Sequence, residues 1–283
     1  MRCVGLFRLP FRRSSFLLQK VDMNVLKELR FRTEAPIADC SAALKETGGE
    51  MDAAITWLRQ RGVARATKKS GRITENGALI AVVDKVYGGG IMTICSETDF
   101  ASRNAHFDAA ATQLNKLLAE MINSSKGSIL SEPPEDLIKR LCAEGKDILS
   151  ETISVLGENV TLRGFAPLTI PPSNCEGDEE RAAPLAFGRY VHNPMPSGDV
   201  GSTVGIVAVR IMTPNAKTDD LNLLAQCFVG NAGDESGYQH QKMLGTDETV
   251  GQWLKGRGLR FCSSLVMGFG KEPCVQHPPI RRK

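Results

Sequence analysis

A hydroxyl, a carboxylate and an aromatic ring follow one another at Thr98, Asp99 and Phe100, where an apolar, strand-like run gives way to a helical pattern. Residues at such a junction are commonly exposed, so these side chains are placed to contact a partner molecule. The same residues also have a local explanation, because Thr98 or Asp99 can cap the helix and Phe100 can pack beside it as a hydrophobic staple. The three residues alone favour the local explanation, so the surrounding sequence must decide.

Motifs for covalent catalysis, metal binding and nucleotide binding are not found. The segment GFGK at 268–271 resembles part of a phosphate-binding loop, but the positions that require Gly and Ser or Thr hold Leu265 and Glu272. The glycines at 88–90 separate two runs rich in Val and Ile, which favours a hairpin turn. The eight cysteines form no CxxC pair and the four histidines lie far apart, which favours a reducing compartment over a zinc site or a disulfide scaffold. We therefore expect no enzyme activity, no metal and no cofactor.

The net charge of +3 is concentrated at the N-terminus of the 283-residue chain. Residues 1–20 hold five basic residues and no acidic one, so the remainder of the chain nets −2. A slightly acidic body gives no electrostatic reason to bind nucleic acid directly. No apolar run approaches the roughly 20 residues that span a bilayer, so we expect no membrane partner either.

The first segment, MRCVGLFRLPFRRSSFLLQK, is rich in Arg, contains Ser and lacks acidic residues. This composition predicts a mitochondrial transit peptide over residues 1–21 and a location in the matrix. A secretory signal is disfavoured because no uninterrupted apolar stretch precedes a small-residue cleavage site. A disordered basic tail is the alternative interpretation.

Three short helices are predicted for residues 22–63, at 24–32, 38–46 and 51–61. Gly48 and Gly49 follow the second helix, and Gly62 is expected to end the third. Three helices in about 40 residues make a minimal bundle, such as a ubiquitin-associated-like domain. The basic and polar residues 64–76 predict a linker.

The rest of the chain repeats a pattern of strands and helices, which predicts an α+β fold. We expect two related α+β subdomains with antiparallel sheets, over 77–157 and 158–271, followed by a disordered tail at 272–283. The expected strands are 78–87, 91–97, 158–170, 185–192, 203–212 and 260–270. The expected helices are 99–122, 135–157, 216–233 and 246–258, with Thr218 and either Thr246 or Asp247 as N-caps of the last two.

Five blocks of the sequence resemble the elongation factor Ts family, and they occur in that family's order between about residues 24 and 271. The first block, VLKELRFRTEAPIADCSAALKETGGEMDAAITWLRQRG, is similar to the family's N-terminal domain. The second, ETDFASRNAHF, is similar to its TDFVAKNxxF signature. The other three are LGENVTLRGF, then GRYVH with VGIVAVRI, and then TVGQWLKGRG. Each block alone is only moderately specific, but their common order makes a chance resemblance improbable.

The resemblance implies that the partner is elongation factor Tu, a GTPase from which members of this family release GDP. The implied partner-binding residues are Arg30, Ile37, Ala38, Thr98, Asp99, Phe100 and His192. The first three match positions that contact the partner's nucleotide domain. Asp99 and Phe100 match a pair that intrudes beside the partner's Mg²⁺ and phosphate site. The histidine matches a contact made by the second subdomain.

The chain departs from the family's pattern at several points. A pair of methionines in the first module is replaced by Ile37 and Ala38, and two loops, 171–184 and 193–203, look like insertions. The coiled-coil module that bacterial members often carry before the final segment has no counterpart here. Its loss, together with the basic leader, indicates the mitochondrial type of elongation factor Ts.

Two other classes of function remain open on the sequence. The first module alone is compatible with a ubiquitin-binding adaptor, although this leaves Thr98–Phe100 without a role. The basic run VARATKKSGR and the terminal RRK are compatible with a ribosome-associated or RNA-binding protein, but the run is short and has no interleaved aromatic residues.

Removing residues 1–21 is expected to abolish import into isolated mitochondria, because the Arg-rich segment carries the predicted import signal. Release of GDP from elongation factor Tu is expected to be unchanged, since the segment precedes the predicted fold. Import is measured by protection of the labelled chain from added protease. Import of the truncated chain at the full-length rate would contradict the targeting assignment.

Overall fold

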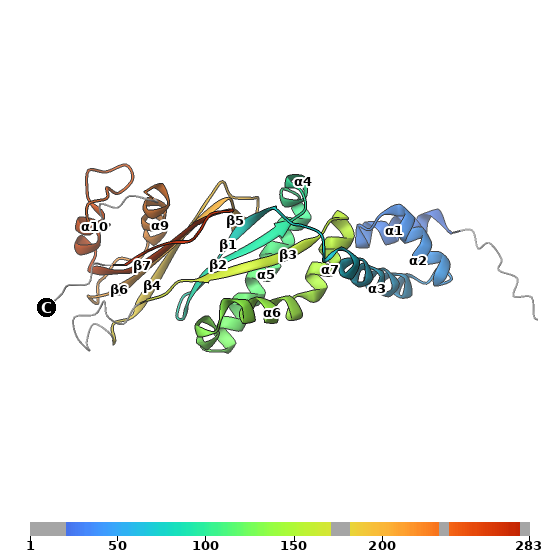
Figure 1. Cartoon of the computed structure of the whole chain (residues 1–283), viewed down its shortest axis with the longest axis horizontal. Coiled ribbons are helices and arrows are strands. Elements are labelled where there is room, and N and C mark those ends of the chain that lie inside the picture. Colours follow the sequence, from blue (N-terminus) through green and yellow to red (C-terminus); the bar gives the residue numbers. More distant parts are fainter. Residues whose placement is uncertain (1–20, 171–181, 232–237, 278–283) are drawn as a thin grey trace, which may run out of the picture. The chain divides into compact units, whose positions relative to one another are not determined.

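The computed structural model describes residues 21–170, 182–231 and 238–277. The chain divides into two compact units, Met1–Arg61 and Gly62–Lys283. The predicted leader up to residue 20, the predicted loop from 171 to 181 and the end of the predicted tail from 278 lie outside the described residues. Helices combine with two antiparallel sheets, which confirms the mixed composition of helices and antiparallel sheets predicted from the sequence (Figure 1).

The N-terminal unit contains α1 (Met23–Thr33), α2 (Ile37–Glu46) and the beginning of α3 (Met51–Lys69). The Asp22 carboxylate caps α1 by accepting a hydrogen bond of 2.8 Å from the Asn24 N–H. The helix ends at Glu34, which adopts a left-handed conformation with φ of 53°. The fully buried side chains of Leu29, Cys40 and Ala43 stand at the centre of this unit's core.

The third helix does not end at Gly62, so the predicted end was wrong. α3 continues to Lys69, because one glycine costs only about 1 kcal/mol relative to alanine and the following VARATKK is otherwise compatible with a helix. Gly62 instead allows close packing, since a Cβ at this position would lie 3.3 Å from the Ser154 Cβ. The predicted linker 64–76 therefore begins with helical residues.

The first sheet has the order β3-β2-β1-β5 and belongs to the second unit. Its strands are β1 (Asn76–Asp84), β2 (Gly88–Ser96), β3 (Val160–Pro167) and β5 (Val200–Gly201). One face is covered by α5 (Ala105–Ser124), α6 (Pro134–Glu144) and α7 (Lys146–Leu156), with a 3-10 turn at Ser128–Ser131 (Figure 1). The core beneath these helices includes Ile80, Met92, Phe107, Leu114 and Leu141, all fully or almost fully buried.

The second sheet has the order β4-β6-β7-β8. Its strands are β4 (Leu185–His192), β6 (Thr203–Ile211), β7 (Leu259–Gly268) and β8 (Cys274–Gln276). The helices α9 (Leu221–Gly230) and α10 (Val250–Gly256) pack on one face of it (Figure 1). The rings of Phe228 and Phe261 stack there with their centroids 5.0 Å apart.

The two sheets also pack against each other. Leu79, Ala81 and Ile91 of the first sheet share a buried cluster with Val204, Ile206 and Leu265 of the second. The side chains between these, such as Ile80 and Val82, point to the helices instead, as the alternation along a strand requires. The second unit is therefore layered as helices, sheet, sheet and helices.

The predicted boundary at residue 158 separates β3 from the sheet to which it belongs. β3 pairs antiparallel with β2, so that Val160 lies opposite Ser96. A local sequence pattern cannot reveal that a strand pairs with another strand more than 60 residues away. The strand expected from residue 158 was therefore interpreted as the start of a new subdomain.

The predicted hairpin forms between β1 and β2, but the glycines at 88–90 do not make its turn. These glycines lie within β2, and the turn is formed by residues 85–87, whose backbone is held by the Asp84 carboxylate. A Cβ at Gly90 would lie 2.3 Å from the Ala166 carbonyl oxygen, so a glycine is needed where β2 and β3 approach closely.

Two predicted helices are each divided. The helix expected at 99–122 forms as α4 (Asp99–Ser102) and α5, because the Asn104 side chain caps a new helix by accepting a bond of 2.9 Å from the His106 N–H. The helix expected at 135–157 forms as α6 and α7, which meet at Gly145.

The predictions for the C-terminal part also need correction. Helix α10 is capped by Thr249, not by Thr246 or Asp247, and α9 begins after Asp220 rather than at Thr218. Residues Cys274–Gln276, expected within a disordered tail, pair with β7 as a short edge strand.

The loop at 193–203, which looked like an insertion, fastens the second sheet to the first layer of helices. The Asp108 carboxylate on α5 is buried and accepts hydrogen bonds from the Ser197 N–H at 2.9 Å and the Ser197 hydroxyl at 2.5 Å. Within the loop, Asp199 forms an ion pair with Arg189 of β4, 2.5 Å apart. The loop then supplies β5 to the first sheet before the chain returns to the second sheet as β6.

Replacing Asp108 with Ala is expected to lower the free energy of unfolding by about 1–2 kcal/mol, because the Ser197 N–H and hydroxyl lose a charged acceptor. Urea unfolding followed by far-ultraviolet circular dichroism measures the change. Asp147→Ala is the matched control, since Asp147 is also a first-turn aspartate but is exposed. Its expected effect is below about 0.5 kcal/mol. Equal losses in the two variants would show that the loop contact contributes nothing.

Candidate functional site

The junction between β2 and α4 presents Phe100 to solvent. The Phe100 side chain is 89% exposed, whereas Ala101 and Ser102 of the same short helix are buried. Thr98 is the N-cap of α4, since its hydroxyl accepts a hydrogen bond of 3.3 Å from the Ala101 N–H. The expectation that Thr98 caps the helix is therefore confirmed. Phe100 is not a hydrophobic staple, and its exposed ring is accessible to another molecule.

Two glutamates fasten this junction to the start of β3. The Glu158 carboxylate accepts hydrogen bonds from the Thr98 N–H at 3.0 Å and from the Thr98 hydroxyl at 2.8 Å. In the other direction, the Glu97 carboxylate accepts a bond of 2.6 Å from the Asn159 N–H. The segments 97–98 and 158–159 therefore hold each other through side chains beyond the last backbone pair.

Basic residues balance these two carboxylates. Arg72 lies 3.3 Å from the Glu97 carboxylate, and the Asn159 amide donates to the Arg72 carbonyl at 3.0 Å. Lys69 donates to the Gly157 carbonyl at the end of α7. Burial lowers the pKa of the Lys69 ammonium and the nearby Arg72 lowers it further, while Glu97 and Glu158 act in the opposite direction.

Asp99 is paired within its own helix. Its carboxylate forms a two-pronged ion pair with Arg103, with both N–O distances 3.1 Å and both side chains largely exposed. An exposed pair at this spacing is worth only about 0.3–0.5 kcal/mol, so Asp99 can exchange Arg103 for another partner at little cost. The spacing of four residues was visible in the sequence, but Arg103 was not recognised there.

The N-terminal unit brings together three other predicted residues. Arg30 lies in the last turn of α1, and Ile37 and Ala38 open α2, so all three flank the short connection between these helices. All three are exposed, Ile37 at 52%. Phe31, which the sequence analysis missed, is 84% exposed beside Arg30. It could have been noticed as an aromatic residue outside the apolar stripe of α1.

His192 is the last residue of β4 and is exposed. It lines an open cavity of about 690 Å³ between α9 and the end of the second sheet. Apolar side chains of Val229, Leu244 and Val266 face the cavity, and Lys271 and Glu272 stand at it as well. Such a concave, mainly apolar surface is suited to a protruding side chain of a protein partner.

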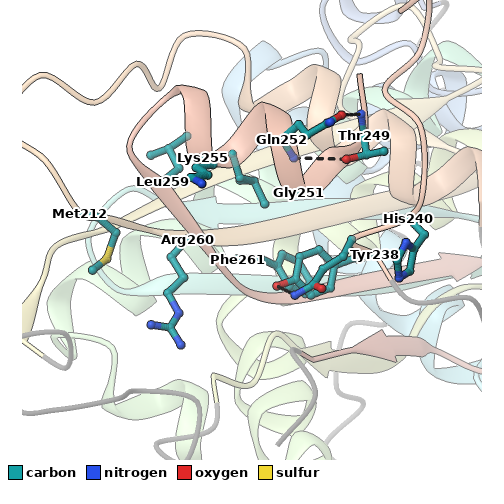
Figure 2. Close-up of a pocket in the computed structure, with 12 residues that line it drawn as sticks. Met212, Tyr238, His240, Thr249, Gly251, Gln252, Lys255, Leu259, Arg260 and Phe261 are labelled. Atoms are coloured by element: carbon teal, nitrogen blue, oxygen red, sulfur yellow. Dashed lines mark hydrogen bonds between the residues drawn. The ribbon is translucent and has the colours of Figure 1, made fainter. Parts of the chain in front are cut away.

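A second cavity, of about 600 Å³, lies beside α10 (Figure 2). Figure 2 shows Tyr238, His240 and Phe261 on one side of it and, on another, the hydrogen bonds between Thr249 and Gln252. In these bonds the Thr249 hydroxyl accepts from the Gln252 N–H and the Gln252 amide oxygen accepts from the Thr249 N–H, which forms a capping box. The TVGQ block is thus explained by the start of a helix, and none of the predicted partner-binding residues lines this cavity.

Within the described residues, no group of three or more His, Cys, Asp or Glu is arranged to hold a metal ion. Among the same residues, no helix has both the length and the apolar character needed to cross a membrane. Burial raises the pKa of the Cys40, Cys95 and Cys227 thiols, which disfavours the reactive thiolate.

Glu158 is the most informative residue that the sequence analysis left without a role. It occurs in the GENV block, but nothing in its neighbourhood indicates that it reaches back 60 residues to Thr98. The signal exists only in three dimensions, because β3 must first pair with β2.

Comparison with known proteins identifies several close relatives, although no protein-family profile matches the chain. The chain is 43% identical to "Elongation factor Ts, mitochondrial" of Leishmania major, over 98% of each chain. It is 44% identical to "Elongation factor Ts 1, mitochondrial" of Trypanosoma cruzi (strain CL Brener), over 89% of this chain and 88% of that protein. A bacterial "Elongation factor Ts", from Beijerinckia indica, is 31% identical over 91% of this chain and 80% of its own.

Replacing Phe100 with Ala is expected to change the free energy of unfolding by less than about 0.5 kcal/mol, because the ring makes few contacts within the chain. Phe107→Ala is the matched comparison, since it removes the same ring from a fully buried position on α5. Its expected cost is about 3–5 kcal/mol. Chemical denaturation of both variants measures the difference, and a loss for Phe100→Ala comparable with that for Phe107→Ala would mean that Phe100 belongs to the core.

Proposed function

Because this chain belongs to the elongation factor Ts family, we propose that it binds elongation factor Tu and promotes release of GDP during translation elongation. The observation that carries this proposal is the exposed ring of Phe100 on a junction fixed by Glu158. A guanine-nucleotide exchange factor needs such a feature, because it acts by inserting side chains into a partner and forms no covalent bond.

The physical basis of exchange is linkage. If the factor and GDP each bind the GTPase but weaken one another, each lowers the other's affinity by the same factor. An aromatic wedge can displace the elements that support the partner's Mg²⁺ and so leave the phosphate charge poorly compensated. An acceleration of about 1000-fold requires the barrier to fall by about 4 kcal/mol, which a buried aromatic ring and a desolvated carboxylate can supply together.

The wedge consists of Phe100 with Asp99 and Thr98 beside it. An exposed phenyl ring gains free energy when it enters an apolar pocket, so its 89% exposure in the free chain is available for binding. Asp99 can release Arg103 at the same moment, since their ion pair is exposed and weak. Thr98 fixes the helix start on which both neighbours sit.

Two other surfaces bind the same GTPase in this proposal. In the N-terminal unit, Arg30, Ile37 and Ala38 contact the nucleotide domain, and the exposed Phe31 adds apolar area. The three-helix arrangement supports a ubiquitin-associated-like fold over residues 22–63. In the second unit, His192 contacts the partner beside the cavity that it lines.

The proposed setting is the mitochondrial matrix, with mitochondrial elongation factor Tu as partner. Support comes from the printed names of the trypanosomatid relatives and from the Arg-rich, acid-free first 20 residues. Neither nucleic acid nor a membrane is required, because the exposed groups at the junction are an aromatic ring and a small, internally paired set of charges.

In the mature domain order, residues 22–63 form the N-terminal module, 64–76 connect it to the core, and 77–271 form the exchange core. The predicted subdomains 77–157 and 158–271 divide this core by sequence only. They do not match the two sheets, because β3 belongs to the first sheet.

The proposal is tested by stopped-flow release of a fluorescent GDP analogue from purified elongation factor Tu. The parent chain is expected to accelerate release strongly. Phe100→Ala is expected to reduce the acceleration about 10- to 100-fold, and Asp99→Ala by a smaller factor, because they remove the ring and the carboxylate that act at the metal site.

Val86→Ala is the matched control, since Val86 is also an exposed apolar residue at 68% but lies in the turn between β1 and β2. It is expected to leave exchange unchanged. A parent chain without effect on GDP release refutes the function, whereas parent-like rates in both Phe100→Ala and Asp99→Ala refute the assigned residues.

A further inference from the structure

We propose that Glu158 and Glu97 form a reciprocal clasp between the end of β2 and the start of β3, and that Glu158 is a positioning residue for the Phe100 wedge. This inference rests on the proposed exchange function and adds a residue that acts through another. Glu158 touches only Thr98 in the described hydrogen-bond network, and Thr98 begins the helix that carries Phe100.

The clasp begins where the backbone ladder stops. Ser96 and Val160 are the last paired residues of β2 and β3. Beyond them the Thr98 N–H donates to the Glu158 carboxylate at 3.0 Å, and the Asn159 N–H donates to the Glu97 carboxylate at 2.6 Å. Each segment thus supplies one carboxylate and one N–H to the other, so side chains continue the pairing after the strands diverge.

Helix α4 depends on this support because it is too short to hold its own shape. It has four residues, and isolated helices become stable in water only at about 12–15 residues. The Thr98 hydroxyl both donates to Glu158 and accepts from the Ala101 N–H, so one group connects the clasp to the first turn. Asn76 adds a bond of 2.9 Å to the Glu97 carbonyl, which fixes the residue just before Thr98.

Basic residues lie close to the carboxylates of the clasp. The Glu97 carboxylate lies 3.3 Å from Arg72, and both glutamates lie within electrostatic reach of the Lys69 ammonium. Hydrogen bonds from N–H groups to ionised carboxylates are stronger than those between neutral groups. Losing either carboxylate would leave a backbone N–H without its acceptor in a partly buried place.

The clasp matters for exchange because the exposed Phe100 ring is positioned only through the backbone that carries it. At 89% exposure, Phe100 is not oriented by contacts of its own, so its direction is that of the Thr98–Ser102 backbone. A displacement of about 1 Å at a reacting or inserting group can cost up to 100-fold in rate. A loosened junction would therefore bind the GTPase through the other surfaces but insert the ring less often.

The test measures GDP release from elongation factor Tu over a range of concentrations of the full-length chain. Glu158→Ala is expected to lower the limiting release rate at saturation about three- to tenfold, with little change in the half-saturating concentration. A general loss of folded protein would instead shift the half-saturating concentration and leave the limiting rate unchanged.

Two further variants separate positioning from general stability. Glu158→Gln retains an amide oxygen that can accept from the Thr98 N–H, so it is expected to recover most of the limiting rate. Glu132→Ala is the matched control, because Glu132 also accepts two hydrogen bonds, from Arg140, but lies between α5 and α6. It is expected to behave as the parent.

The outcomes distinguish the inference from the function on which it rests. If the parent chain fails to accelerate GDP release, the exchange function itself is wrong. If the parent is active and Glu158→Ala reaches the same limiting rate, the clasp does not position the wedge. If Glu158→Ala does not fold, Glu158→Asp decides, because its shorter side chain withdraws the carboxylate from the Thr98 N–H and hydroxyl. A lower limiting rate with a parent-like melting temperature supports the inference, and an unchanged limiting rate overturns it.

Discussion

A four-residue helix cannot hold an aromatic ring in water by itself, and the architecture around α4 answers this constraint. The pairing of β2 with β3 brings residues 97–98 to residues 158–159, where carboxylates replace the missing backbone bonds. The helices beneath the first sheet keep both strands in place through buried side chains such as Met92 and Phe107. The position of the exposed Phe100 thus depends on buried core residues far from it in the sequence.

In the proposed function, the two units carry different kinds of partner surface. In the N-terminal unit the exposed residues are distributed around the connection of α1 and α2, where Phe31 and Ile37 offer apolar area. In the second unit a single ring projects from one junction, and a histidine borders a concave surface on the other sheet. Several weak contacts of this kind allow a factor to bind firmly and still be displaced when a nucleotide returns.

Local physics made much of this fold predictable. The positions of most strands and helices follow from alternation and helical periodicity. The local pattern favoured a staple for Phe100, and only the family resemblance implied its exposed position. Three features could not be predicted from the sequence, and the reason is the same for each. The pairing of β3, the role of the glycines at 88–90 and the reach of Glu158 each depend on a contact between distant segments. The predicted helix end at Gly62 was wrong for a different reason. The modest helix penalty of one glycine is outweighed by the helix-forming residues around it and by its close packing against Ser154.

The short strand β5 has a consequence for the order in which the chain can fold. Val200 and Gly201 complete the edge of β1, and β6 begins after a single intervening residue. A chain emerging from its N-terminus would therefore expose one side of β1 until residue 200 arrives, more than 100 residues later. An open strand edge is a template for unwanted pairing. The late arrival of those two residues leaves the edge of β1 at Leu79 and Ile80 unpaired while most of the first sheet can already form.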